Sequence, residues 1–144
     1  MEANKHYETG KKLYESGKTE LAIKSFDAAI ALKNDVAGYY WNRGRAYDKL
    51  GKFQLAISDF TKAIEFNADF YRAYVLRGRS KYYLQDFNGA IEDLNKALEI
   101  KKDFVEAIVI RSMCKSKTGD TEGANEDFIK ATKLGFNPKK KGNF

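Results

Sequence analysis

Hydrophobic residues along this chain recur with the spacing of amphipathic helices that come in pairs. Tyr40, Tyr47 and Leu50 lie seven and three residues apart, and a second apolar run follows Gly51. That second run consists of Leu55, Ala56, Phe60, Ala63 and Ile64. Its steps of one, three and four place apolar side chains on one face of a helix. Because Gly51 can adopt the positive φ that ends a helix, the segment predicts two helices joined by a turn.

The same arrangement repeats every 34 residues, four times without insertion or deletion, in units 3–36, 37–70, 71–104 and 105–138. The eighth position is small in every unit, the twentieth and twenty-seventh are alanine, and the twenty-fourth is bulky. The eighth-position residues are Gly10, Gly44, Gly78 and Ser112, and the bulky residues are Phe26, Phe60, Leu94 and Phe128. Small residues opposite bulky ones let two helices approach closely, and a larger side chain there costs roughly 1 to 3 kcal/mol. The chain therefore predicts four stacked helical hairpins.

These positions closely resemble the tetratricopeptide repeat over nearly the whole chain. Departures are local: the eleventh position, aromatic in the family, is Lys81 and Lys115 in the last two units, and the fourth position holds His6 and Ile108 as well as tyrosines. The resemblance implies an all-α, right-handed superhelical solenoid of four hairpins, or eight helices. Its first helices would line a concave groove and its second helices would form the convex back. We expect a single array over 3–138, followed by a basic tail at 139–144.

Three features of the repeat predict how the array is held together and where it ends. The turn position is glycine in three units, whereas the third unit has Gln85-Asp86. Position seven is arginine and position twenty-three is aspartate in the last three units, which predicts an ion pair that bridges the two helices of each hairpin. The pairs are Arg43 with Asp59, Arg77 with Asp93, and Arg111 with Asp127. Polar Asn125 and Thr132 replace apolar residues on the outer face of the last unit, so we expect the array to stop there, with Gly135 and Pro138 ending the last helix.

Composition agrees with a non-membrane protein that has no catalytic centre. The 144 residues are 43% hydrophobic and 32% charged, and no long apolar run could span a membrane. The segment 1–18 is charged and lacks a secretory signal, and the single cysteine, Cys114, excludes an intrachain disulfide, so we expect a cytoplasmic location. The single histidine, His6, occupies a packing position, and there is no zinc-binding cluster or glycine-rich phosphate loop. We therefore expect no enzymatic activity and no cofactor or metal.

The family resemblance places positions two, five, six, nine, twelve and thirteen of each first helix in the groove. Position nine is Lys11, Arg45 and Arg79 in the first three units and Met113 in the last. The full set of candidate groove residues is Tyr7, Lys11, Tyr14, Trp41, Asn42, Arg45, Lys49, Arg72, Arg79, Tyr82, Tyr83 and Met113. A row of cations beside aromatic rings suits an extended peptide that offers carboxylates and apolar side chains. The leading hypothesis is a noncatalytic scaffold or adaptor that binds an extended acidic segment of a partner protein.

Several alternatives to this peptide groove stay open from the sequence. The cations could pair with Glu8, Glu15 or Asp48 and be solvated. The carboxylate clamp of some family members, which binds acidic chaperone tails, is incomplete here: the clamp positions hold Tyr7, Lys11, Asn42, Arg72 and Leu76, of which only Asn42 matches and Arg72 keeps its charge.

Two further alternatives concern other kinds of partner. An apolar patch could mediate self-association or receive the tail through Phe136 and Phe144. Its residues would be Val75, Leu76, Val109, Ile110 and Met113. The net charge of +6 and Lys139-Lys140-Lys141 could attract nucleic acid weakly, although no nucleic-acid-binding motif accompanies them.

Overall fold

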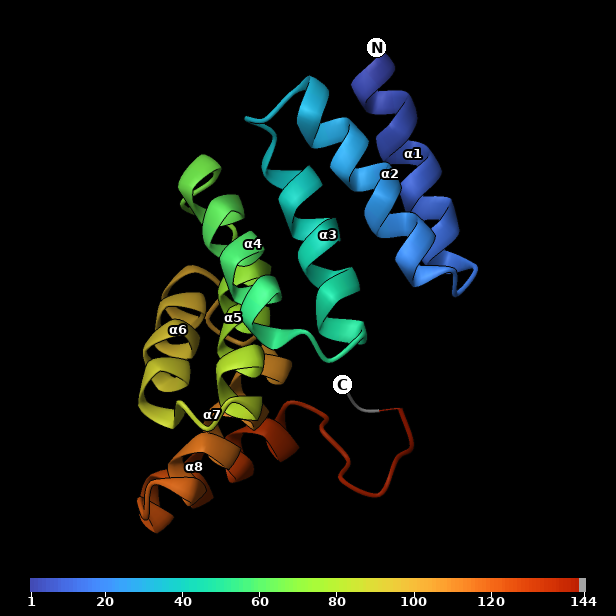
Figure 1. Ribbon diagram of the computed structural model, residues 1–144. Coiled ribbons are helices and arrows are strands. Elements are labelled where there is room, and N and C mark those ends of the chain that lie inside the picture. Colours follow the sequence, from blue (N-terminus) through green and yellow to red (C-terminus); the bar gives the residue numbers. More distant parts are fainter. Residues whose placement is uncertain (143–144) are drawn as a thin grey trace.

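The computed structural model describes residues 1–142, and within them the chain forms eight α-helices and no strand (Figure 1). The helices are α1 (Glu2–Glu15), α2 (Thr19–Leu32), α3 (Ala37–Lys49), α4 (Phe53–Phe66), α5 (Tyr71–Tyr83), α6 (Phe87–Ile100), α7 (Val105–Lys117) and α8 (Thr121–Lys133). Odd-numbered helices are the first helices of the four hairpins, and even-numbered helices are the second. None of these helices has the length and apolar character needed to cross a membrane.

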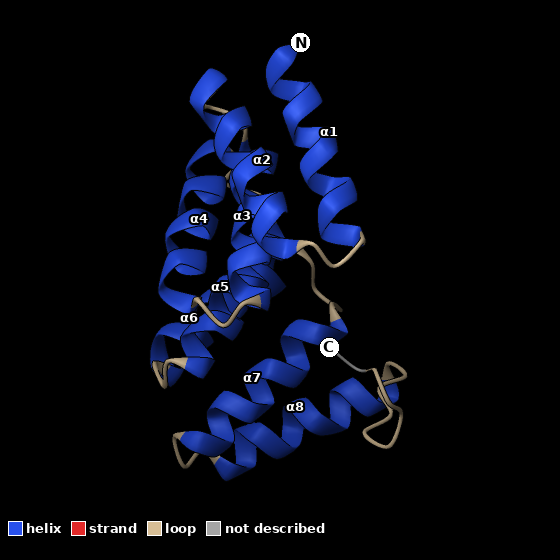
Figure 2. Cartoon of the chain, turned by 45° about the vertical axis from the view of Figure 1, so that its right-hand side comes forward, coloured by secondary structure: helices blue, strands red, loops and turns tan. Residues whose placement is uncertain are grey.

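The contacts between helices show which side of the stack is concave. Each second helix packs against the first helix of the next hairpin, so that the hairpins form a continuous stack (Figures 1 and 2). The first helices also contact one another along the stack, α1 with α3, α3 with α5, and α5 with α7. Within residues 1–142, successive second helices make no such contact. The first helices therefore lie on the inner, concave side, and the second helices on the outer side.

The small residues of the repeat are required by contacts inside each hairpin. A Cβ atom added to Gly10 would lie 2.6 Å from the ring of Phe26, and one added to Gly44 would lie 2.8 Å from the ring of Phe60. In the last unit, Ser112 replaces the glycine and its hydroxyl donates to the carbonyl oxygen of Ala124 at 2.7 Å. The predicted close approach of small and bulky positions is thus confirmed.

The turns follow the predicted pattern, including its one exception. Gly17, Gly51 and Gly119 all have φ between 73° and 86°, and Gln85 adopts the same left-handed conformation with φ 66°. Asp86, which follows Gln85, accepts a hydrogen bond from the backbone N–H of Gly89 at 3.0 Å and so caps α6. The third turn therefore keeps the shared geometry although its residue has a side chain.

The predicted ion pairs are present and bidentate. In each of the last three hairpins, Nε and Nη2 of the arginine donate to the two oxygens of a buried aspartate. The distances are 2.9 and 2.8 Å for Arg43 and Asp59, 2.9 and 2.6 Å for Arg77 and Asp93, and 2.8 and 2.7 Å for Arg111 and Asp127. The remaining nitrogen, Nη1, reaches the preceding hairpin, where it donates to Asp27, Thr61 or Asn95 at 2.8, 3.1 and 2.9 Å respectively. Each arginine therefore joins three helices, which the sequence pattern did not predict.

The two lysines that depart from the family pattern take part in the same clusters. Nζ of Lys81 lies 2.9 Å from Asp93, and Nζ of Lys115 lies 3.0 Å from Asp127. In the second hairpin the equivalent residue is Tyr47, and its ring lies 5.9 Å from the guanidinium carbon of Arg43. The eleventh position therefore contacts the Arg–Asp pair whether it is aromatic or basic.

Beyond α8 the chain turns back toward the first helices. Helix α8 ends at Lys133, and Gly135 follows with φ 105°. The side chain of Phe136 packs against a cluster of Ile108, Val109 and Ala131, and residues 136–142 loop back toward the middle of the molecule (Figures 1 and 2). The C-terminal segment is therefore placed on the side of the first helices.

Candidate functional site

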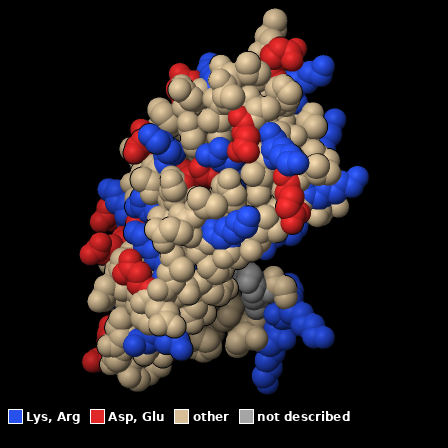
Figure 3. Space-filling view, in the orientation of Figure 1, with Lys and Arg blue, Asp and Glu red and all other residues tan. Residues whose placement is uncertain are grey.

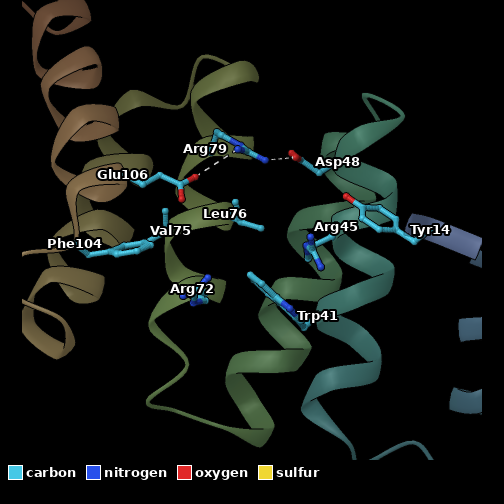
Figure 4. Close-up of a pocket in the computed structure, with 10 residues that line it drawn as sticks. All are labelled: Tyr14, Trp41, Arg45, Asp48, Arg72, Val75, Leu76, Arg79, Phe104 and Glu106. Atoms are coloured by element: carbon cyan, nitrogen blue, oxygen red, sulfur yellow. Dashed lines mark hydrogen bonds and ion pairs between the residues drawn. The ribbon is translucent and has the colours of Figure 1, made fainter. Parts of the chain in front are cut away.

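The first helices line three adjoining pockets that together form a groove. The N-terminal pocket has a volume of about 240 Å³ and is lined by Lys11, Tyr14, Glu15, Asn42, Arg45 and Lys49. The central pocket has a volume of about 380 Å³ and is lined by Tyr14, Trp41, Arg45, Asp48, Arg72, Val75, Leu76, Arg79, Phe104 and Glu106 (Figure 4). The C-terminal pocket has a volume of about 310 Å³ and is lined by Arg79, Tyr82, Tyr83, Val109, Ile110, Met113, Phe136, Pro138, Lys140 and Gly142. Arg45 joins the first two pockets and Arg79 joins the last two.

Arg79 stands between two carboxylates at the edge of the central pocket. Its Nη2 donates to Oδ2 of Asp48 at 2.6 Å, and its Nη1 lies 3.5 Å from Oε1 of Glu106 (Figure 4). Asp48 also accepts a hydrogen bond from the hydroxyl of Ser80 at 3.0 Å. Burial raises the pKa of Glu106, and the positive charges of Arg79 and Arg72 oppose this rise. The charge of Arg79 is therefore already balanced inside the protein.

Lys11 is also paired, at the other end of the row. Its Nζ lies 2.9 Å from Oε1 of Glu8 and 4.7 Å from the centre of the Tyr7 ring. Lys11 and Arg79 therefore follow the alternative that the sequence left open, pairing with Glu8 and Asp48. Of the three cations at position nine, only Arg45 has no carboxylate within 4.0 Å among residues 1–142. The partners of Arg79 come from helices α3 and α7, and such contacts between repeats have no fixed spacing in the sequence.

Three groove cations on the first helices have no carboxylate within 4.0 Å among residues 1–142: Arg45, Lys49 and Arg72. Arg45 lies over the rings of Tyr14 and Trp41, at 4.9 and 5.7 Å, and Lys49 lies 4.9 Å from the Tyr14 ring. The guanidinium of Arg72 lies 5.7 Å from the ring of Phe104. Contacts with aromatic faces orient these cations but leave their positive charge unneutralised.

Two of the candidate residues, Tyr7 and Asn42, are used inside the array. Nδ2 of Asn42 donates to the hydroxyl of Tyr7 at 2.8 Å and to the carbonyl oxygen of Gly38 at 3.0 Å, and its Oδ1 accepts from Arg45 at 3.3 Å. Tyr7 packs against Tyr39, with ring centres 4.8 Å apart, and burial raises the pKa of its hydroxyl. Two of the positions that form a carboxylate clamp in other family members are therefore occupied by structural contacts.

The apolar patch suggested by the sequence is mostly covered. Val75, Leu76, Val109 and Ile110 are buried, whereas Met113 is 42% exposed. Val75 and Ile110 belong to a buried cluster with residues of α6, and Leu76 belongs to one with residues of α4. Val109 belongs to the cluster against which Phe136 packs. All five residues line the central or the C-terminal pocket, but only Met113 is exposed among them, and self-association stays a prediction. Phe136 does reach this surface, and Phe144 lies outside the described residues.

Tyr82 and Tyr83 stand at the edge of the C-terminal pocket. Tyr83 is 55% exposed, and its ring stacks on Phe53 of α4 with centres 4.8 Å apart. Tyr82 packs edge-on to Phe87, with ring centres 5.5 Å apart. Both residues therefore combine packing against the neighbouring second helices with a place in the pocket wall.

Groups with chemical reactivity are few in the described part of the chain. Cys114 is buried, and burial raises the pKa of its thiol to about 11, so that the nucleophilic thiolate is scarce at neutral pH. Residues 1–142 contain no group of three His, Cys, Asp or Glu side chains that could hold a metal ion. On the face seen in Figure 3, Lys and Arg side chains are interspersed with Asp and Glu over most of the helices. The helices on this face therefore offer no continuous basic surface of the kind that tracks a nucleic-acid backbone, and a separate group of basic side chains projects at the lower right (Figure 3).

Comparisons with known proteins agree with this architecture. Sequence models of the tetratricopeptide repeat match residues 10–51, 40–70 and 71–104, which together run from 10 to 104. No curated protein gives a significant match. The crystal structure of MamA is similar, with 25% identity and a TM-score of 0.88 over 91% of this chain and 77% of that chain.

Two similar structures contain bound peptides. The first tetratricopeptide domain of Spaghetti (RPAP3), bound to the HSP90 peptide SRMEEVD, has 27% identity and a TM-score of 0.80 over 82% of this chain and 94% of that chain. The second such domain of human RPAP3, in complex with the HSP70 peptide SGPTIEEVD, has 29% identity and a TM-score of 0.77 over 80% and 96% of the two chains. From the repeat matches and the four stacked hairpins we conclude that this chain is a member of the tetratricopeptide repeat family.

Proposed function

We propose that the chain is a noncatalytic interaction scaffold whose groove binds an extended acidic segment of a partner protein. The observation that carries this proposal is the pair of cations in the central pocket, Arg45 and Arg72, which have no carboxylate within 4.0 Å among residues 1–142. A guanidinium can bind a carboxylate through two parallel hydrogen bonds, which gives both affinity and orientation. Trp41 and Phe104 lie beside these cations and offer apolar surface to the rest of the peptide.

The charges along the groove favour an acidic ligand. The central pocket holds three arginines and two carboxylates, and the N-terminal pocket holds Lys11, Arg45 and Lys49 with Glu15. An acidic segment would therefore meet an excess of positive charge over both pockets, and the attraction would weaken as salt screens it. The two peptides bound by the RPAP3 domains both end in EEVD, so related folds do bind acidic segments. Because Tyr7 and Asn42 are already engaged, the carboxylates would be bound here through Arg45 and Arg72.

Charge reversal in the central pocket tests the proposal. We expect the double variant Arg45→Glu, Arg72→Glu to lose affinity for peptides with three consecutive glutamates by at least tenfold, because each charge-assisted hydrogen bond contributes about 1.5 to 3 kcal/mol. Binding is measured by fluorescence anisotropy with labelled peptides. The matched control is Lys24→Glu, Lys62→Glu, which changes the net charge equally at exposed positions on α2 and α4.

Two results would contradict the proposal. Equal losses in the two double variants would show a response to net charge alone. Binding of a single-stranded oligonucleotide at least as tightly as the acidic peptides would identify the partner as a polyanion of another class, with a steep dependence on salt.

A further inference from the structure

We infer that the groove recognises a two-part motif: carboxylates at the central and N-terminal pockets, and one large apolar side chain in the C-terminal pocket. This inference rests on the proposed function and adds a second determinant to it. The structural reason is that the groove changes character along its length while remaining continuous through Arg79, which lines both the central and the C-terminal pocket.

The C-terminal pocket is suited to an apolar group. Its wall includes the exposed side chains of Tyr83 and Met113 and the half-buried Tyr82, and no carboxylate is among its lining residues. Its volume of about 310 Å³ is at the lower end of the range for sites that enclose small ligands. Its wall holds two cations: Arg79, whose charge Asp48 and Glu106 already balance, and Lys140, an exposed residue of the C-terminal segment. A large apolar side chain in this pocket would be removed from water against the aromatic and aliphatic part of the wall.

The C-terminal segment forms a wall of this pocket instead of filling it. Phe136 is the anchor: it packs against Val109 and Ala131, and its ring stands edge-on to Phe128 with centres 6.1 Å apart. The following residues form a turn in which Lys140 N–H donates to the carbonyl oxygen of Asn137 at 3.1 Å. Pro138, Lys140 and Gly142 then line the pocket, which stays open in the described structure. The segment 136–142 thus completes a binding site for another chain.

One extended peptide can reach both determinants. Arg45 lies on α3 and Met113 lies on α7, two first-helix spacings apart. At about 10 Å per packed helix pair, the two sites are roughly 20 Å apart. An extended chain covers that distance with about six residues. We therefore predict that about six residues of an extended peptide separate its acidic part from its apolar side chain.

A matched peptide series tests the inference. Each labelled peptide carries three glutamates, a Gly-Ser spacer of two, four or six residues, and a terminal Phe or Ala. With the wild-type chain we expect Phe to bind about tenfold more tightly than Ala, and only with the longer spacers. Met113→Asp should remove this preference while the Ala peptide loses at most a few-fold. The control Ile129→Asp introduces the same charge at an exposed apolar position of α8 and should keep the preference.

Truncation after Asn137 tests whether the C-terminal segment forms part of the pocket or competes with the peptide for it. Removing residues 138–144 should abolish the preference for Phe if the segment forms the pocket. Tighter binding of both peptides after truncation would show that the segment competes with the ligand, and this would overturn the inference.

The other outcomes are equally decisive. Equal affinity of the wild-type chain for the Phe and Ala peptides would overturn the two-part motif and leave the acidic groove standing. Failure of every peptide in the series to bind would overturn the proposed function and this inference together. A preference for Phe that Met113→Asp leaves intact would place the apolar determinant outside the C-terminal pocket.

Discussion

Aspartates at one repeat position have different pKa values in different hairpins because their neighbours differ. Burial alone would raise the pKa of Asp127, but hydrogen bonds from Arg111 and Lys115 outweigh burial, and the pKa lies below 3.8. Burial raises the pKa of Asp59, and Arg43 offsets this only in part because the negative charge of Asp27 acts in the same direction as burial. Lys115 therefore supplies one of the hydrogen bonds that lower the pKa of Asp127, whereas Asp27 adds to the rise at Asp59.

Because the pKa of Asp127 is lowered and that of Asp59 is raised, replacing each aspartate by asparagine should change stability with opposite dependence on pH. A lowered pKa contributes stability that is present above about pH 4 and is lost as the pH falls through the folded-state pKa. A raised pKa contributes stability that is present at acidic pH and is lost as the pH rises through the folded-state pKa. We therefore expect Asp127→Asn to destabilise the protein by roughly 2 to 3 kcal/mol at pH 7, with a smaller difference from wild type at pH 3.5. For Asp59→Asn the difference should instead grow at pH 3.5.

Urea unfolding monitored by circular dichroism at both pH values measures these differences. Parallel trends in the two variants would mean that Lys115 and Asp27 do not distinguish the two sites. Glu92→Gln, at an exposed position of α6, serves as the control and should show little change at either pH.

Residue types and spacings predicted which side chains are present in the groove better than they predicted which are available to a ligand. The Arg–Asp pairs were predictable because both partners recur within one hairpin at fixed positions. For Arg79 the sequence offered Asp48, in the preceding repeat, only as one of several possible partners, and it did not indicate Glu106, in the following repeat. Neither carboxylate recurs at its position in the other repeats, so only their placement in space reveals the contact.

At the scale of helices, Arg79 links three first helices through charged groups. It extends from α5 to Asp48 on α3 and to Glu106 on α7. The same carboxylates occupy the pocket in which we propose that a peptide carboxylate binds. Stability and affinity for an acidic ligand should therefore oppose each other at this position.

Removing one of these carboxylates tests this opposition. We expect Asp48→Asn to lower the free energy of unfolding by about 1 to 2 kcal/mol, because it breaks a partly buried pair. It should also raise the affinity for acidic peptides several-fold, because Arg79 would be free to bind the ligand. Glu65→Gln makes the same charge change in an exposed pair with Lys62 on α4 and is the control. Denaturant unfolding and peptide titration measure the two effects, and a loss of peptide affinity in Asp48→Asn would contradict the prediction.

The helices and turns themselves were predictable because the information is local and is repeated four times. The spacing of small and bulky residues predicted the hairpins, and even Gln85, without a glycine's freedom, adopts the positive φ of the shared turn. The path of the chain after Gly135 could not be predicted from the sequence in the same way. Residues 136–142 follow no repeat, and their placement depends on the seam between α7 and α8 that receives Phe136. This segment supplies a wall of the C-terminal pocket, so part of the candidate site was visible only in the structure.

At the scale of the whole molecule, residues at the same repeat position are buried to different extents in different hairpins. A hairpin inside a solenoid is covered by neighbours on both sides, whereas the last one is covered on one side only. The bulky residue at position twenty-four shows the difference: Phe60 is fully buried, whereas Phe128 is 42% exposed and meets Phe136 on its outer side. The polar residues Asn125 and Thr132 are exposed on the same end of the array, as the sequence predicted.

The position of a hairpin in the stack should therefore decide how much a buried ring contributes to stability. We expect Phe60→Ala to destabilise the protein by about 3 to 5 kcal/mol, because it leaves a cavity under Gly44. Phe128→Ala should destabilise the protein by only about 1 to 2 kcal/mol, since less of its ring is removed from water on folding. Urea unfolding gives the two free energies, and hydrogen exchange should show faster opening of α8 than of α4 in the wild type. Similar losses in both variants, with uniform exchange along the helices, would mean that the array unfolds as a single unit in which the end repeat is no weaker than the middle.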